Sequence, residues 1–75
     1  MQKSDFNEFF NTLTMREKQI LSFVVGGLTS CEIAKTLNRT ESTVKKHREH
    51  ILQKAHVKGV TAIRRFLTEV QPHLP

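Results

Sequence analysis

The sequence predicts an all-α domain with four main helices and a short extra helical segment at the N-terminus. Apolar residues recur every three or four positions along most of the chain. Thr stands three residues before Glu where two of these stretches begin, and Gly or Asn stands where they end. A chain of 75 residues supports only one simple core, because a domain of this size buries about 60% of its unfolded surface.

The N-terminal quarter of the chain contains two helical patterns. Residues 5–12 are expected to form a short amphipathic helix, with Ser4 or Asp5 as N-cap and aromatic rings that cover the core. Thr14 and Glu17 match a capping box, which predicts a helix over 15–25 that ends at Gly26-Gly27. We therefore assign residues 1–12 to a partly helical extension and residues 13–71 to the domain proper.

The middle of the chain predicts two helices joined by a very short break. Thr29 starts the first helix with a second capping box, Asn38 ends it, and the next helix runs over about 41–55. A break of about three residues is typical of a helix-turn-helix, here 29–48. Ala34 allows close approach of the helices, Asn38 tolerates a left-handed turn, and Val44 supplies an apolar contact. The alternative is an ordinary αα-hairpin in a helical bundle.

A last amphipathic helix is predicted before Pro72, which leaves residues 72–75 as a C-terminal tail. Its apolar stripe is wider than one small domain needs; it comprises Val60, Ile63, Phe66, Leu67 and Val70. We expect Ile63 and Leu67 to pack inward, which leaves Phe66 and Val70 free for a partner. The alternative is that Phe66 simply closes the core.

The positive charge of the chain is concentrated in one half. Residues 35–65 carry nine Lys or Arg against two acidic residues, a local charge of +7, whereas the formal charge of the whole chain is +5. Such asymmetry favours a polyanionic partner, and nucleic acid is preferred over an anionic membrane. The alternative is a basic surface that is solvated and binds no partner.

Composition argues against several other classes of protein. The chain has one cysteine, Cys31, so an internal disulfide is excluded and a cytoplasmic location is expected. No apolar run reaches the ~20 residues needed to span a bilayer, and no signal-peptide pattern opens the chain. No catalytic motif or cofactor pattern is present. His47 and His50, even with Cys31 or His56 added, match no zinc-binding pattern, so no metal is expected.

The pattern of motifs resembles the C-terminal DNA-binding domain of the LuxR/GerE family of bacterial transcription regulators. The matching residues are Leu13-Thr14-x-Arg16-Glu17, Ile20-Leu21, Gly27-Leu28-Thr29, Glu32-Ile33-Ala34, Leu37, Thr43-Val44-Lys45-x-His47, Ile51, Lys54 and Val57. The resemblance implies a non-enzymatic, sequence-specific transcription regulator in the bacterial cytoplasm, associated with the nucleoid when bound to duplex DNA. An adaptor that uses the same fold to contact RNA polymerase, as in region 4 of sigma factors, is the alternative.

Helical periodicity predicts which residues would contact DNA. The side of the 41–55 helix opposite Val44 predicts Ser42, Lys45, Lys46 and Glu49 as base-reading residues. Glu49 has the alternative of an ion pair with Lys45 or Lys46. The residues expected to contact phosphates are Thr29, Ser30, Thr43, His50, Lys54 and Lys58. Thr29 has a purely structural alternative as a helix cap.

The resemblance also places the last helix at a two-fold dimer interface, and the outward side of its apolar stripe makes Phe66 and Val70 the expected contacts. A homodimer would call for an inverted-repeat DNA site. Two origins fit the short segment before the motif: a stand-alone regulator or an excised C-terminal domain.

Overall fold

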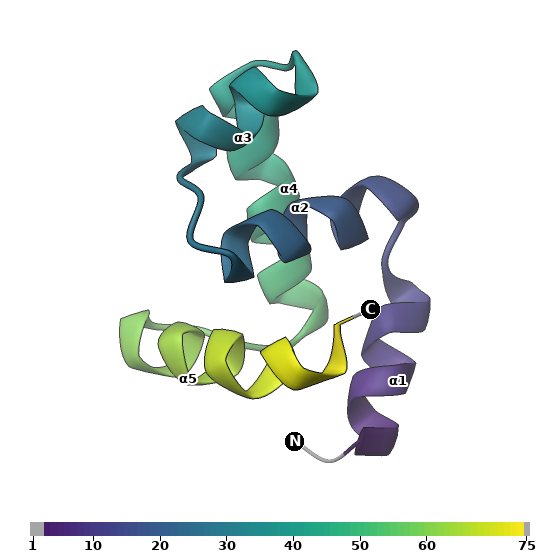
Figure 1. Ribbon diagram of the computed structural model, residues 1–75. Coiled ribbons are helices and arrows are strands. Elements are labelled where there is room, and N and C mark those ends of the chain that lie inside the picture. The colour runs from purple at the N-terminus through teal and green to yellow at the C-terminus, as the bar shows by residue number, and fades with distance from the viewer. Residues whose placement is uncertain (1–2, 75) are drawn as a thin grey trace.

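The computed structural model describes residues 3–74 and shows an all-α fold (Figure 1). The described part of the chain contains no strand. Its elements in order are α1 (Lys3–Thr12), α2 (Met15–Val25), α3 (Ser30–Leu37), α4 (Glu41–Lys54), α5 (Val60–Val70) and the short 3-10 helix η1 (Gln71–His73). The predicted fold class, with an extra helix before the four main ones, is confirmed.

Local hydrogen bonds start α2 and α3 as the sequence predicted. The Thr14 hydroxyl accepts a hydrogen bond from the Glu17 amide at 3.1 Å, and the Glu17 carboxylate accepts one from the Thr14 amide at 2.9 Å. Thr29 and Glu32 repeat the arrangement at 3.2 and 3.0 Å. Both capping boxes are therefore confirmed.

The expected cap of α1 is wrong, because the helix begins earlier than predicted. Helix α1 starts at Lys3, so Ser4 and Asp5 lie within its first turn and neither precedes it as N-cap. A negative charge in the first turn is favourable for another reason, namely its attraction to the positive end of the helix dipole. Asp5 occupies such a position.

The turn between α3 and α4 depends on a left-handed residue. Asn38 adopts φ 54° and ψ 48°, which most side chains tolerate poorly and which Asn accepts more readily than most. The Arg39 amide then donates to the Ala34 carbonyl at 2.9 Å, which closes the end of α3. Thr40 caps α4 through a hydrogen bond from the Thr43 amide at 3.2 Å. The predicted helix-turn-helix is thus present, with Ala34 and Val44 both buried between its helices.

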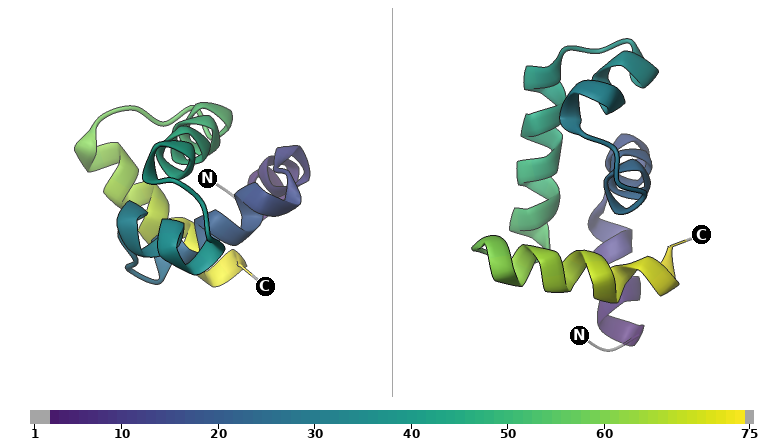
Figure 2. Two further views of the ribbon diagram at one scale, coloured as in Figure 1. Left: turned by 90° about the horizontal axis from the view of Figure 1, so that it is seen from above. Right: turned by 60° about the vertical axis from the view of Figure 1, so that its left-hand side comes forward.

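The core lies where α2 crosses α4, and α1 and α5 close its lower end (Figures 1 and 2). The buried apolar side chains come from all five helices and the adjoining loops; they are Phe6, Phe9, Leu13, Ile20, Leu21, Ile33, Ala34, Val44, Ile51, Ala55, Phe66 and Val70. As Figure 2 shows, α5 lies across the end of α4 remote from α3. This arrangement leaves the α3–α4 turn and the first turns of α4 at the opposite end of the molecule.

The expectation that Phe66 and Val70 face outward is wrong. Phe66 is 4% exposed and Val70 0% exposed. The Phe66 ring meets the Phe9 ring of α1 edge-on, with centroids 5.5 Å apart. Ile63 and Leu67, which were expected to pack inward, are both half-buried, and Leu67 packs against the core. The physical reason is that α1 brings its own aromatic rings to α5, so the part of the stripe that contains Phe66 closes the core.

The chain after α5 is also more ordered than a simple tail. The His73 ring in η1 stacks on the Phe6 ring of α1, with centroids 4.3 Å apart. Leu74 packs against the core. None of the described helices is long and apolar enough to cross a membrane.

Candidate nucleic-acid interface

Helix α4 has one buried face and one exposed face. Val44 and Ile51 are almost fully buried against α2 and α3. The four predicted base-reading residues, Ser42, Lys45, Lys46 and Glu49, are all exposed. Their spacing of three, four and seven residues puts them on one side of a helix. The structure therefore gathers these four side chains into a single solvent-facing strip, which we call the α4 strip.

The α4 strip is positioned by the turn before it. The Thr40 cap and the left-handed Asn38 fix the direction in which α4 leaves α3. The start of α4 lies at the end of the molecule away from α1 and α5 (Figure 2). An α-helix that protrudes in this way has the dimensions to enter the major groove of B-DNA.

The charges of the α4 strip are held only weakly by the protein itself. The Lys45 ammonium lies 3.4 Å from the Glu41 carboxylate one turn earlier, and both side chains are exposed. Exposed pairs of this kind contribute only about 0.3–0.5 kcal/mol. Lys45 pairs with Glu41 and not with Glu49, the alternative partner considered from the sequence. Lys46 forms no ion pair among the described residues. The two ammonium groups are available to an incoming ligand.

Four of the six predicted phosphate-contacting residues are exposed: Thr29, Thr43, His50 and Lys58. The Thr43 hydroxyl lies 2.8 Å from the Thr40 hydroxyl, and Thr29 serves as the cap of α3. The Thr29 amide donates to the Glu32 carboxylate, and with its hydroxyl it holds the pKa of Glu32 below its usual value. The structural role of Thr29 is therefore present, and a phosphate contact would be additional to it.

Ser30 is placed differently from the expectation. Its side chain is buried, and its hydroxyl accepts a hydrogen bond of 2.7 Å from Arg48 on α4. Arg48 therefore ties the start of α3 to the middle of α4. A phosphate contact by Ser30 would have to be made in addition to this hydrogen bond, and it stays a prediction.

Lys54 also has partners within the protein, and its predicted phosphate contact stays a prediction. Its ammonium lies 2.7 Å from Glu17 Oε1 and donates a further hydrogen bond of 2.8 Å to the Thr12 carbonyl. Burial alone would raise the pKa of Glu17, but hydrogen bonds from Lys54 and Thr14, with the charge of Lys54, hold that pKa below its usual value. Lys54 thus joins α4 to the α1–α2 junction, and its charge is largely compensated within the protein.

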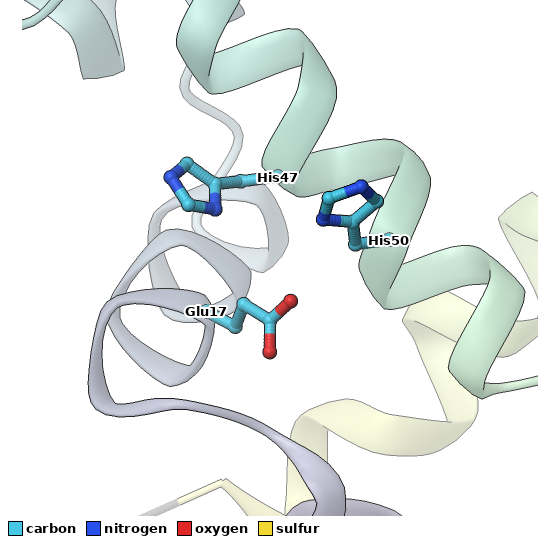
Figure 3. Close-up of side chains that lie close together, drawn as sticks. All are labelled: Glu17, His47 and His50. Carbon is cyan, nitrogen blue, oxygen red and sulfur yellow. The ribbon is translucent and has the colours of Figure 1, made fainter.

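The structure brings together one group of side chains that sequence reasoning missed. Glu17 of α2 lies beside His47 and His50 of α4, with one potential ligand atom of each within 4.8 Å of the others (Figure 3). The histidines were considered with Cys31 and His56, which are not members of this group among the described residues. Glu17 is thirty positions away in sequence, so spacing along the chain gave no signal of it.

Comparison with known proteins identifies the family. Residues 11–67 match the family described as bacterial regulatory proteins of the luxR family. The chain belongs to the LuxR family. The match covers the helix-turn-helix and the α4 strip, and the family consists of DNA-binding transcription regulators, not enzymes. The predicted family, fold and non-enzymatic class are confirmed.

Individual relatives agree with this LuxR-family assignment. The chain is 32% identical over 71 residues to the response regulator protein TodT of Pseudomonas putida, a match that covers 95% of this chain and 31% of TodT. It is 35% identical over 72 residues to the transcriptional regulatory protein TdiR of Thauera aromatica, covering 96% of this chain and 32% of TdiR. It is 48% identical over 49 residues to the nitrate/nitrite response regulator protein NarL of Escherichia coli, covering 65% of this chain and 23% of NarL.

The LuxR-type chain spans about a third or less of the length of these curated relatives. No solved structure matches it closely enough to be counted as similar.

Proposed function

We propose that this LuxR-type domain regulates transcription by binding duplex DNA in a sequence-specific manner, with α4 in the major groove. The observation that carries the proposal is the α4 strip, which is exposed while Val44 and Ile51 fix the opposite face in the core. Lys45 and Lys46 can donate hydrogen bonds to O6 and N7 of guanine, and Glu49 can accept one from N4 of cytosine. Ser42 lies at the start of α4, where a recognition helix enters the groove most deeply.

Phosphate anchoring in this proposal falls to exposed groups that flank the α4 strip. They are Thr29 and Thr43 at the starts of α3 and α4, His50 farther along α4, and Lys58 in the loop after it. Helix N-termini favour anions because their amides and dipole point outward. Ser30 and Lys54 are the less accessible members of the predicted set, because Ser30 is buried and Lys54 is paired with Glu17.

We further propose that two copies bind an inverted-repeat site through α5. With Phe66 and Val70 in the core, the apolar side chains of α5 that keep exposed area are Val60, which is 67% exposed, the exposed Ala62, and the half-buried Ile63 and Leu67. A symmetric contact there would set two recognition helices about one DNA turn, ~34 Å, apart. An apolar patch this small suggests a weak dimer that DNA completes.

Selection of bound sites from a pool of random duplexes tests the proposal. The expected result is one enriched motif with two-fold symmetry, bound in mobility shifts at low salt. If no duplex is enriched or shifted, DNA binding is refuted. Retention of the domain by RNA polymerase without DNA would then favour the alternative that this fold serves as a protein-interaction adaptor.

A further inference from the structure

Glu17, His47 and His50 form a cluster with the composition of a metal site, and it lies outside the α4 strip. Three potential ligand atoms, one from each side chain, lie within 4.8 Å of one another. Figure 3 shows a nitrogen of each imidazole ring turned toward the Glu17 carboxylate, whose upper oxygen points into the space between the rings. Two helices, α2 and α4, therefore contribute to one cluster of polar side chains.

The Glu17 carboxylate has one oxygen to spare for a ligand. Both of its hydrogen bonds, from the Thr14 amide and from the Lys54 ammonium, go to Oε1. Oε2 is thus the atom available to a cation. The pKa of Glu17 lies below its usual value, so the carboxylate is ionised near neutral pH and needs no deprotonation before it can bind.

We propose that Glu17, His47 and His50 bind a divalent transition-metal ion of the zinc type, which clamps α4 to α2. Two imidazole nitrogens and one carboxylate oxygen are a ligand set that suits Zn²⁺, with a fourth position left for water. Tetrahedral Zn²⁺ holds its ligand atoms about 3.3 Å apart, given bonds of about 2.0–2.2 Å. The cluster must therefore contract by about 1.5 Å from its outer limit.

The side chains can make that contraction without a change of backbone. His50 is exposed and free to change rotamer, whereas His47 is half-buried and already faces α2. Lys54, whose ammonium lies 2.7 Å from Glu17 Oε1, opposes metal binding by repulsion. Its ammonium keeps a second partner, the Thr12 carbonyl at 2.8 Å, toward which it can move when Glu17 binds a metal.

His50 is also one of the proposed phosphate contacts, so the metal site is tested on the 75-residue chain without DNA. Titration calorimetry with Zn²⁺ should show one site, and the melting temperature by circular dichroism should rise with Zn²⁺ and fall again with EDTA. Mg²⁺ should do neither, because it prefers oxygen ligands. Absence of both effects with Zn²⁺ would overturn the proposal.

Variants locate the site. His50→Gln should weaken Zn²⁺ binding by more than about tenfold, since loss of even an outer-shell partner of a metal ligand costs about 10–100-fold. His56→Gln, a second exposed histidine, and Cys31→Ser are the matched controls and should leave the affinity unchanged. Unchanged affinity in His50→Gln, or loss in either control, would place the metal elsewhere and refute the assignment.

His47→Gln provides a second test on the half-buried ligand. Because this substitution can lower stability by itself, its readout is the rise in melting temperature on addition of Zn²⁺, measured against the same variant without metal. The rise should disappear. A rise equal to that of the unaltered chain would exclude His47 as a ligand.

Discussion

The ion pair between Lys54 and Glu17 should stabilise the fold, and Lys54→Met removes its cation while keeping an apolar stem. The Glu17 side chain is only 4% exposed, so the substitution leaves a buried carboxylate with the Thr14 amide as its remaining hydrogen-bond donor. A hydrogen bond to a charged group contributes about 1.5–3 kcal/mol. Because 34% of the Lys54 side chain is exposed, solvent screening places the expected loss near the lower end, at about 1.5 kcal/mol.

This loss is large enough to measure by thermal unfolding. In a domain of this size 1 kcal/mol shifts the melting temperature by about 4–8 °C, so Lys54→Met should melt about 6–12 °C lower. Lys58→Met is the matched control, because Lys58 is exposed in the loop after α4. Its stability should stay within about 0.5 kcal/mol of the unaltered chain.

The pH dependence of the same variant has a definite sign. In the unaltered chain the pKa of Glu17 is lowered on folding, so the pair stabilises the protein at neutral pH and this contribution is lost as the pH falls through the folded-state pKa. In Lys54→Met only the hydrogen bonds from Thr14 oppose the effect of burial, so the pKa of Glu17 should be higher than in the unaltered chain and protonation should cost less. The stability gap between the two proteins should therefore narrow on acidification. A Lys54→Met protein as stable as Lys58→Met at neutral pH, or a gap that widens in acid, would refute the reasoning.

Three further predictions follow from the fold and the proposed function. Phe66→Glu should unfold the domain, because Phe66 is buried in the core. Ile63→Glu should stay helical by circular dichroism and lose cooperative binding to a full inverted repeat. Cooperative binding by folded Ile63→Glu would exclude α5 as the dimer contact. Asn38→Val should lower the free energy of unfolding in urea by about 1–2 kcal/mol because of the left-handed backbone, while Asn38→Gly should be nearly neutral; equal effects would contradict this. Affinity for DNA should fall with salt at a log–log slope of about −0.9 per phosphate contacted, and an affinity indifferent to salt would favour the adaptor reading.

The features that the sequence predicted well are those that depend on near neighbours. Each of them involves residues within about one or two helical turns of one another. They are the capping boxes at Thr14 and Thr29, the turn at Asn38 and the burial of Val44 on the inner face of its helix. Hydrogen bonds and helical periodicity at that range are fixed by spacing alone. The exposed α4 strip followed directly, because burial of one face of α4 exposes the other.

The features that the sequence did not predict depend on contacts between distant helices. Helical periodicity showed that the α5 stripe was too wide, but only the Phe9 ring of α1 decides that Phe66 closes the core. Lys54 pairs with Glu17, which is thirty-seven positions away in the sequence. Helical periodicity could not show this partner, so Lys54 was predicted to be an unpaired surface cation. The same distance hid the proximity of Glu17 to His47 and His50.

The central claim is that the α4 strip reads bases, and the affinity of Lys46→Ala for its selected site and for random duplex tests it most directly. Lys46 is exposed and forms no ion pair within the described residues, so its loss should leave the fold intact. If Lys46 reads bases, Lys46→Ala should lose about 1–3 kcal/mol of binding free energy on the selected site and change little on random DNA. Lys18→Ala, which removes an exposed lysine of α2, should change neither. Discrimination between the two duplexes that is unaltered in Lys46→Ala would contradict the account.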